Sequence, residues 1–187
     1  MKMQDQLKTL ARDGVLRVAI NTGNRALVQE DAGTLKGVSP ALAQRLADEI
    51  GARMEPVIYS GAGKVFDDAG QDKWDVGFLA IDAMRAQKIA FTQPYIVIEA
   101  TYAVRAGTPP ESFAEFRAGR CDAVAGVRAS LEGAFAKDED IQILPGALTS
   151  VHQAMVLPDR DDPRIAALDD FVARAIESAF IAAAQSA

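Results

Sequence analysis

Few side chains in this sequence have the types and spacing that nucleophilic or metal chemistry requires. His152 is the only histidine and Cys121 the only cysteine, so a catalytic triad and a zinc site both lack members. The acidic runs are typical of solvated loops, and their spacing does not match a calcium-binding loop: Asp67-Asp68, Asp138-Glu139-Asp140 and Asp161-Asp162. We therefore expect no catalytic residue, no bound metal and no cofactor.

Polar side chains that suit a small solute follow the first predicted strand. Asn21, Thr22 and Asn24 lie in the loop that leaves residues 15–20. Ligands of open α/β sheets bind at the carboxyl ends of the strands, which is where this loop begins. The same three residue types are also ordinary turn formers, and at this point both interpretations stay open.

The composition is that of a globular protein. The chain has 187 residues, of which 49% are hydrophobic and 25% are charged, enough for a substantial core. A net charge of −6 favours solubility and disfavours nucleic acid as a partner, because phosphates attract a basic surface. The sequence contains no apolar run long enough to span a bilayer.

The first half of the chain alternates strands and helices. Apolar runs predict strands at 15–20, 54–59 and 75–81, with a turn at 34–37 and a short helix or loop at 61–70. Ser39 and Pro40 predict the start of a helix, with Ser39 as its N-cap, and Gly51 predicts its end. Leu42, Leu46 and Ile50 would form its buried face. This order predicts an α/β fold with a parallel sheet.

A short helix at 83–88 and a strand at 96–104 are expected before a proline-containing linker at 105–110. After the linker we expect shorter elements: strands at 121–126, 141–144 and 151–157, and helices at 111–118, 128–136 and 164–184.

Three stretches together resemble a known family. They are Leu16-Arg17-Val18-Ala19-Ile20, the run from Leu35 through Gly37-Val38-Ser39-Pro40 to Ala47, and the run from Trp74-Asp75-Val76-Gly77 through Arg85 to Pro94-Tyr95. In this order they are similar to the first lobe of extracellular solute-binding proteins of family 3, the polar amino-acid type. A weaker similarity resumes at Phe116 and continues through Asp122-Ala123-Val124 to the C-terminal helix.

The resemblance implies a type II periplasmic-binding-protein fold, in which two α/β lobes close on a solute. It places Arg85 where the family grips the ligand carboxylate, and a guanidinium suits that task because it donates two parallel hydrogen bonds. Phe78 and Ala80 match positions that hold the ligand through backbone groups and a hydroxyl, which Ala80 lacks. Asp82 is expected to cap the next helix, with ligand contact as its second role. These residues join Asn21, Thr22 and Asn24 in the expected ligand site.

The second lobe departs from the family pattern. Only residues 111–115 stand where the family has a strand-helix-strand stretch, so a complete first lobe and a truncated second lobe are expected. We assign residues 1–107 and part of the C-terminal region to the first lobe, 111–160 to the second, and 164–187 to a C-terminal helix. A small sheet with an uncovered edge favours pairing with a second copy, and a homodimer is expected.

The resulting hypothesis is a solute-binding protein of an ABC-type importer, whose partners are a carboxylate-bearing solute and the membrane subunits of the transporter. Two alternatives stay open: a dehydratase-like enzyme on the same fold, and a sensor or interaction module that has lost transport. The polar N-terminus carries no secretory signal. We expect a periplasmic protein whose signal has been removed, with a cytoplasmic location as the alternative.

Overall fold

The chain divides into two compact units in a computed structural model. The model describes residues 2–31, 33–105, 123–128, 131–132, 135–137, 139 and 141–185. Unit 1 comprises Met1–Ile96 and His152–Ala187, and unit 2 comprises Val97–Val151. Two strands, β6 (Ala90–Arg105) and β9 (Thr149–Leu157), carry the chain from unit 1 into unit 2 and back.

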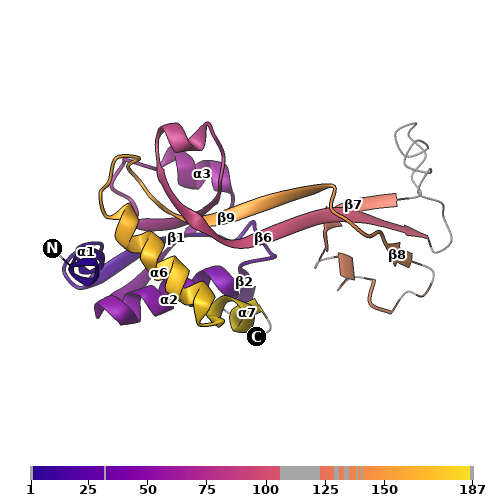
Figure 1. The fold of residues 1–187 in the computed structure, drawn as a ribbon, viewed down its shortest axis with the longest axis horizontal. Helices are drawn as coiled ribbons and strands as arrows, with labels where there is room; N and C mark the ends of the chain where they lie inside the picture. The colour runs from indigo at the N-terminus through magenta and orange to yellow at the C-terminus, as the bar shows by residue number, and fades with distance from the viewer. Residues whose placement is uncertain are drawn as a thin grey trace. The chain divides into compact units, whose positions relative to one another are not determined.

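Unit 1 is built on a parallel sheet. Its central strand β1 (Val15–Asn21) pairs in parallel with β4 (Arg53–Tyr59) on one side and β5 (Val76–Ala80) on the other, which confirms the predicted arrangement. Strand β9 continues the sheet antiparallel to β5, with Gly77 opposite Val156 and Ala80 opposite Gln153. The order of the strands that belong wholly or partly to unit 1 is β4-β1-β5-β9-β6 (Figure 1).

Helices cover both faces of this sheet (Figure 1). Helix α2 (Val38–Ile50) packs on β1 and β4, and helix α3 (Ala62–Asp67) packs on the same two strands from the opposite side. Helix α6 (Ile165–Glu177) contacts α1 (Met3–Lys8) and α7 (Phe180–Gln185), and α7 contacts α2. Since both faces are covered, β5 is apolar throughout and buried at Val76 to Leu79.

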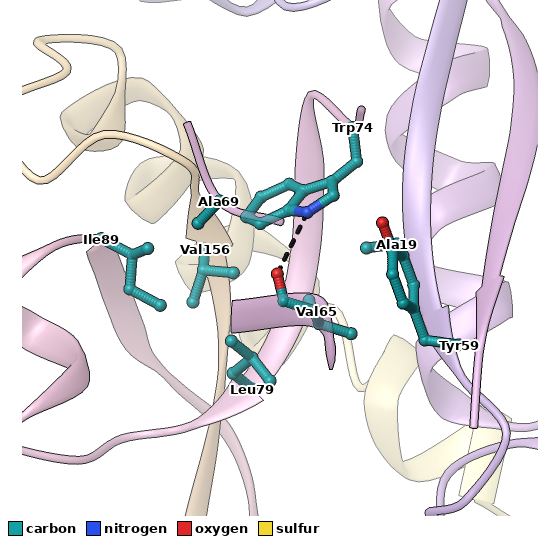
Figure 2. Packing of buried hydrophobic residues seen from close by; sticks show 8 residues of the cluster. All are labelled: Ala19, Tyr59, Val65, Ala69, Trp74, Leu79, Ile89 and Val156. Atoms are coloured by element: carbon teal, nitrogen blue, oxygen red, sulfur yellow. Dashed lines mark hydrogen bonds between the residues drawn. The ribbon is translucent and has the colours of Figure 1, made fainter. Parts of the chain in front are cut away.

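A core cluster around Trp74 lies on the α3 side of the sheet (Figure 2). The indole is 1% exposed, and its Nε1–H donates to the Val65 carbonyl at 3.2 Å. The other members are aliphatic apart from one tyrosine: Ala19, Tyr59, Val65, Ala69, Leu79, Ile89 and Val156. The cluster therefore joins α3 to four strands, β1, β4, β5 and β9, and to the segment that follows β5.

Helix α2 forms where its apolar spacing predicts, but it begins differently. Leu42, Leu46 and Ile50 are buried as expected, and Gly51 ends the helix in the left-handed conformation. The prediction that Ser39 is the N-cap was wrong, because the helix starts at Val38 and the cap is Gly37. Gly37 has a φ of 106°, and a Cβ there would meet the Leu27 carbonyl oxygen. Ser39 is instead buried, and its hydroxyl forms a hydrogen bond of 2.9 Å with the hydroxyl of Tyr95.

Two other segments differ from the sequence-based expectation. The segment expected to be a turn at 34–37 holds strand β3 (Thr34–Lys36), which pairs with β2 (Gln29–Asp31) as an antiparallel hairpin. The expected single helix at 164–184 is two helices, because Ala179 between α6 and α7 takes a positive φ of 55°. The spacing of apolar residues predicts neither the pairing of β2 with β3 nor the backbone conformation of Ala179.

Unit 2 is antiparallel where the structure describes it. Strand β7 (Ala123–Val127) and strand β8 (Ile141–Ile143) each pair with the part of β6 that lies in this unit. The predicted helix at 111–118 and Cys121 lie outside the described residues, as do residues 129–130 and 133–134 of the predicted helix at 128–136. The 3-10 helix η1 (Arg85–Gln87), in unit 1, stands in place of the short helix expected at 83–88.

None of the helices in the described ranges has the length and apolarity needed to cross a membrane.

Candidate functional site

Three loops of unit 1 leave the sheet at the same edge. They follow β1, β4 and β5, which are neighbouring parallel strands and therefore end on one side of the sheet. The loop after β1 holds Asn21 to Asn24, the loop after β4 begins at Ser60, and the loop after β5 runs from Ile81 to Arg85. This edge is the place where open α/β sheets bind ligands.

The loop after β1 is held tightly against the loop after β4. Thr22 donates its backbone N–H and its hydroxyl to the Tyr59 carbonyl, at 2.9 and 3.2 Å. A Cβ at Gly23 would lie 2.7 Å from the Ser60 carbonyl oxygen, so a larger residue would push the two loops apart. Asn21 accepts the Gly23 N–H at 3.0 Å through its Oδ1, which is the local turn that asparagine favours.

Asn24 is the loop residue whose side chain remains available. Its backbone carbonyl accepts the N–H groups of Leu27 and Val28, at 3.0 and 2.9 Å. Its half-buried carboxamide has no hydrogen-bond partner among the described residues. Of the three polar residues expected here, Asn21 and Thr22 therefore shape the loop, and Asn24 presents an unused polar group.

Asp82 caps the turn that carries Arg85. Its Oδ1 accepts the backbone N–H groups of Met84 and Arg85, at 2.9 and 3.1 Å. Its backbone carbonyl accepts the N–H of Ala86 at 2.9 Å. The structure thus shows the capping role that the sequence favoured, and this cap fixes the backbone from which the Arg85 side chain departs.

Arg85 differs from most of the half-buried arginines of unit 1, which pair with carboxylates; Arg45 is the other exception, and it bonds the Ser178 hydroxyl and covers the Phe180 ring. Its Nη1 donates to the Ala80 carbonyl at 3.2 Å, and no carboxylate of the described chain pairs with it. By contrast, Arg17 makes a two-pronged contact with Asp75, at 3.1 Å from Nε and 2.7 Å from Nη2. Arg174 grips Glu49 in the same way, at 3.1 and 2.7 Å. Arg85 alone of these three therefore keeps most of its five N–H donors for another partner.

The two strand positions behind Arg85 have separate roles. Phe78 is 5% exposed and meets the Tyr95 ring edge-on, with centroids 5.7 Å apart. Tyr95 is itself buried, and this burial raises the pKa of its hydroxyl although the bond to Ser39 acts in the opposite direction. Ala80 is half-buried, and its carbonyl orients Arg85. The Phe78 side chain thus belongs to the core, whereas Ala80 belongs to the edge.

A hollow of about 850 Å³ adjoins the loop after β1. Charges of both signs border it, along with polar and small residues: Thr22, Arg25, Val28, Gln29, Glu30 and Gly33. His152 lies at the same edge of the sheet, where its backbone carbonyl accepts the Ile81 N–H at 2.8 Å. Among the described residues, no group of three or more histidine, cysteine or acidic side chains is placed to hold a metal ion.

Sequence reasoning missed two features of this edge. The close approach of Gly23 to Ser60 joins residues far apart in the chain, and no local pattern reports it. Gln153 lies on β9 directly opposite Ala80, a position that depends on the antiparallel register of β9 on β5. The sequence pattern around Gln153 predicted a strand, but it could not predict that this strand pairs with β5 or that Gln153 lies opposite Ala80.

The fold is shared with solute-binding proteins of known structure. The holo form of ArgBP from T. maritima has a TM-score of 0.67 and 19% identity, over 95% of this chain and 96% of that chain. An amino acid ABC transporter substrate-binding protein from Streptococcus pneumoniae, bound to L-arginine, has a TM-score of 0.71 and 17% identity, over 100% and 97%. An ancestral cationic amino acid solute binding protein has a TM-score of 0.73 and 16% identity, over 99% and 98%. No curated protein matches the chain.

These neighbours are type II periplasmic binding proteins, and the α/β architecture with a short second lobe agrees with the fold predicted from the sequence. The family model for bacterial extracellular solute-binding proteins, family 3, matches residues 16–186, which is nearly the whole chain. The match includes all three polar loops and both units. This chain therefore belongs to the bacterial extracellular solute-binding proteins of family 3.

Proposed function

We propose that this protein binds a small solute with a carboxylate group, such as an amino acid or an organic acid, and that Arg85 grips the carboxylate. One observation supports this most strongly: Arg85 is half-buried at the ligand-binding edge of the sheet and has no carboxylate partner in the described chain. Keeping a cation partly dehydrated without an anion is unfavourable, and a solute carboxylate would relieve that cost.

The surroundings of Arg85 prepare it for this contact. The Asp82 cap orders the backbone at Arg85, and the Ala80 carbonyl restrains one end of the guanidinium. Less side-chain freedom is then lost when a solute binds, which favours affinity. The Asn24 carboxamide and the hollow beside Thr22 offer further polar contacts for the rest of the solute.

Delivery to an ABC importer is the second part of the proposal. Structural neighbours include substrate-binding proteins of amino acid ABC transporters, and the family is described as extracellular. We therefore infer a periplasmic or extracellular protein whose protein partners are the membrane subunits of a transporter. A dehydratase-like enzyme would need a free general acid or base at the site. Asp82 is occupied as a cap, so binding without catalysis is the better supported proposal.

Isothermal titration calorimetry with L-arginine, L-lysine, L-glutamate and succinate would test the carboxylate site. Arg85→Ala should abolish the binding of whichever probe the protein binds. Arg85→Lys should weaken it by about tenfold or more, because lysine keeps the charge but loses the fork. Arg53→Ala is the matched control, since Arg53 is exposed on β4 and its side chain pairs with Glu55.

Binding that survives Arg85→Ala would contradict the proposal. Absence of binding to every probe would favour the sensor or interaction module, and turnover of a bound probe would favour the enzyme.

We also propose a homodimer, because the short second lobe, assigned to 111–160, leaves sheet edges that a second copy can cover. Phe113 and Phe116, two large apolar residues assigned to this lobe, lie outside the described residues. Phe180 is half-buried and is covered on one face by the Arg45 guanidinium, 4.6 Å from the ring centroid. Light scattering at micromolar concentration tests the dimer, and a monomer mass of 19.9 kDa would contradict it.

A further inference from the structure

Gln153 is the exception among the buried polar side chains of unit 1. It is 7% exposed, and no hydrogen bond of its side chain is formed within the described part of the chain. The other buried polar residues of the unit all have partners. Ser39 bonds Tyr95, Thr92 bonds the Gln93 carbonyl and the Met155 N–H, Asp75 bonds Arg17, and Asp162 bonds Arg164.

The amide of Gln153 is nevertheless not sealed inside the protein. No fully enclosed side-chain nitrogen or oxygen in the described chain lacks a hydrogen-bond partner. The carboxamide of Gln153 has no such partner, so its polar atoms must keep a small opening to the outside. A buried polar group that lacks a partner calls for an explanation, and an external ligand is one that this opening allows.

The position of Gln153 connects it to Arg85. Gln153 is opposite Ala80 in the antiparallel ladder, so the two side chains lie on the same face of the sheet. The carbonyl of the same Ala80 accepts a hydrogen bond from Arg85. A guanidinium and an unused carboxamide therefore adjoin one residue at the edge of unit 1.

From this arrangement we infer that Gln153 is a second ligand contact, which donates its side-chain N–H to the carboxylate-bearing end of the solute that Arg85 holds. The inference rests on the proposed function and adds a residue that determines affinity and specificity. A carboxamide both donates and accepts hydrogen bonds. Gln153 can thus also accept a hydrogen bond from a hydroxyl or ammonium group next to the carboxylate, and it adds no charge to compete with the solute.

The test uses the full chain and the same four probes: L-arginine, L-lysine, L-glutamate and succinate. Gln153→Met keeps the length of the side chain and removes its hydrogen bonds. It should weaken binding of the accepted probe by about 10- to 100-fold, as expected for a hydrogen bond to a charged group, while the melting temperature stays unchanged or rises. Gln153→Glu should weaken binding more than Gln153→Met, because a carboxylate there would pair with Arg85. If Gln153 had only a structural role, the affinity would not fall in the order unsubstituted protein, Gln153→Met, Gln153→Glu.

The matched control is Gln44→Met, the same substitution at an exposed glutamine of α2 whose amide bonds Asp48. It should leave affinity unchanged. Equal affinity of Gln153→Met and the unsubstituted protein would overturn this inference and leave the role of Arg85 standing. Binding of no probe by the unsubstituted protein would overturn both proposals. Should Gln153→Met lower the melting temperature, Gln153→Asn provides the second variant, and unchanged affinity there would also overturn the inference.

Discussion

Unit 1 and unit 2 bury their interiors by different means. Unit 1 encloses Trp74 and an apolar cluster between α3 and the sheet, with residues from four strands, from α3 and from the segments that flank β5 (Figure 2). In the described part of unit 2, the buried apolar residues are Leu131 and Leu144. Burial of apolar surface is the main source of folding free energy, so unit 1 carries more of it.

Unit 2 relies instead on side chains that bind backbone carbonyls. Thr101 is 2% exposed, and its hydroxyl lies 3.1 Å from both the Leu144 and the Gly146 carbonyl oxygens. The Arg128 guanidinium also donates to these two carbonyls and reaches Glu99 at 3.1 Å. The described part of unit 2 is therefore held together largely by a few polar contacts. A substitution of Thr101 or Arg128 preserves these contacts when the new side chain donates to the same carbonyl oxygens.

The largest effect is expected in the core of unit 1. Trp74→Ala should lower the free energy of unfolding by about 3–5 kcal/mol, because it leaves a cavity and an unpaired Val65 carbonyl. Guanidinium chloride titration followed by circular dichroism measures the loss. Trp74→Phe is the control: it keeps most of the buried ring and should lose clearly less. An alanine variant as stable as the unsubstituted protein would contradict the central role of this cluster.

An intermediate and local effect is expected in unit 2. Arg128→Ala should destabilise the segment around Leu144 and Gly146 by about 1–3 kcal/mol, the cost of leaving bonded carbonyls without a donor. Hydrogen exchange of peptides covering 99–105 and 141–148 should become faster, while the fluorescence of the single tryptophan in unit 1 stays unchanged. Lys137→Ala, an exposed position in unit 2, is the control. A change confined to unit 1 would refute the proposed contrast.

The smallest effect concerns a polar contact at the rim of the apolar cluster. The Tyr59 hydroxyl donates to Asp68 Oδ2 at 3.0 Å, and Tyr59→Phe should cost about 0.5–1.5 kcal/mol at neutral pH. Burial, together with the bond to Asp68, raises the pKa of Tyr59 to about 12. An unfolded tyrosine has a pKa of about 10. The contribution is therefore complete below pH ~10 and is lost as the pH rises toward about 12.

Denaturant titrations below and above this range measure the difference, and the phenylalanine variant should lose stability less steeply with rising pH. An identical pH dependence in both proteins would show that Tyr59 does not titrate differently on folding.

The sequence predicted the framework of unit 1 because its signals are local. Strands β1, β4 and β5 and helix α2 follow from apolar runs and from the spacing of Leu42, Leu46 and Ile50. Their parallel order follows from the alternation of strand and helix. The resemblance to family 3 rested on the same residues, and the family model confirms it. Arg85 could be named because its position within that pattern is fixed by the strand that precedes it.

The tertiary structure decided what depends on contacts between distant segments. Ser39 lost its expected role as a cap because Gly37 has the positive φ that the start of α2 requires, and because the Tyr95 hydroxyl, brought in by β6, is its partner. The absence of a carboxylate beside Arg85 is visible only once every neighbour in the described chain is placed. Gln153 reached the edge of the site through the register of β9 on β5. Local patterns specify which segments form strands, but register is set by packing across the sheet.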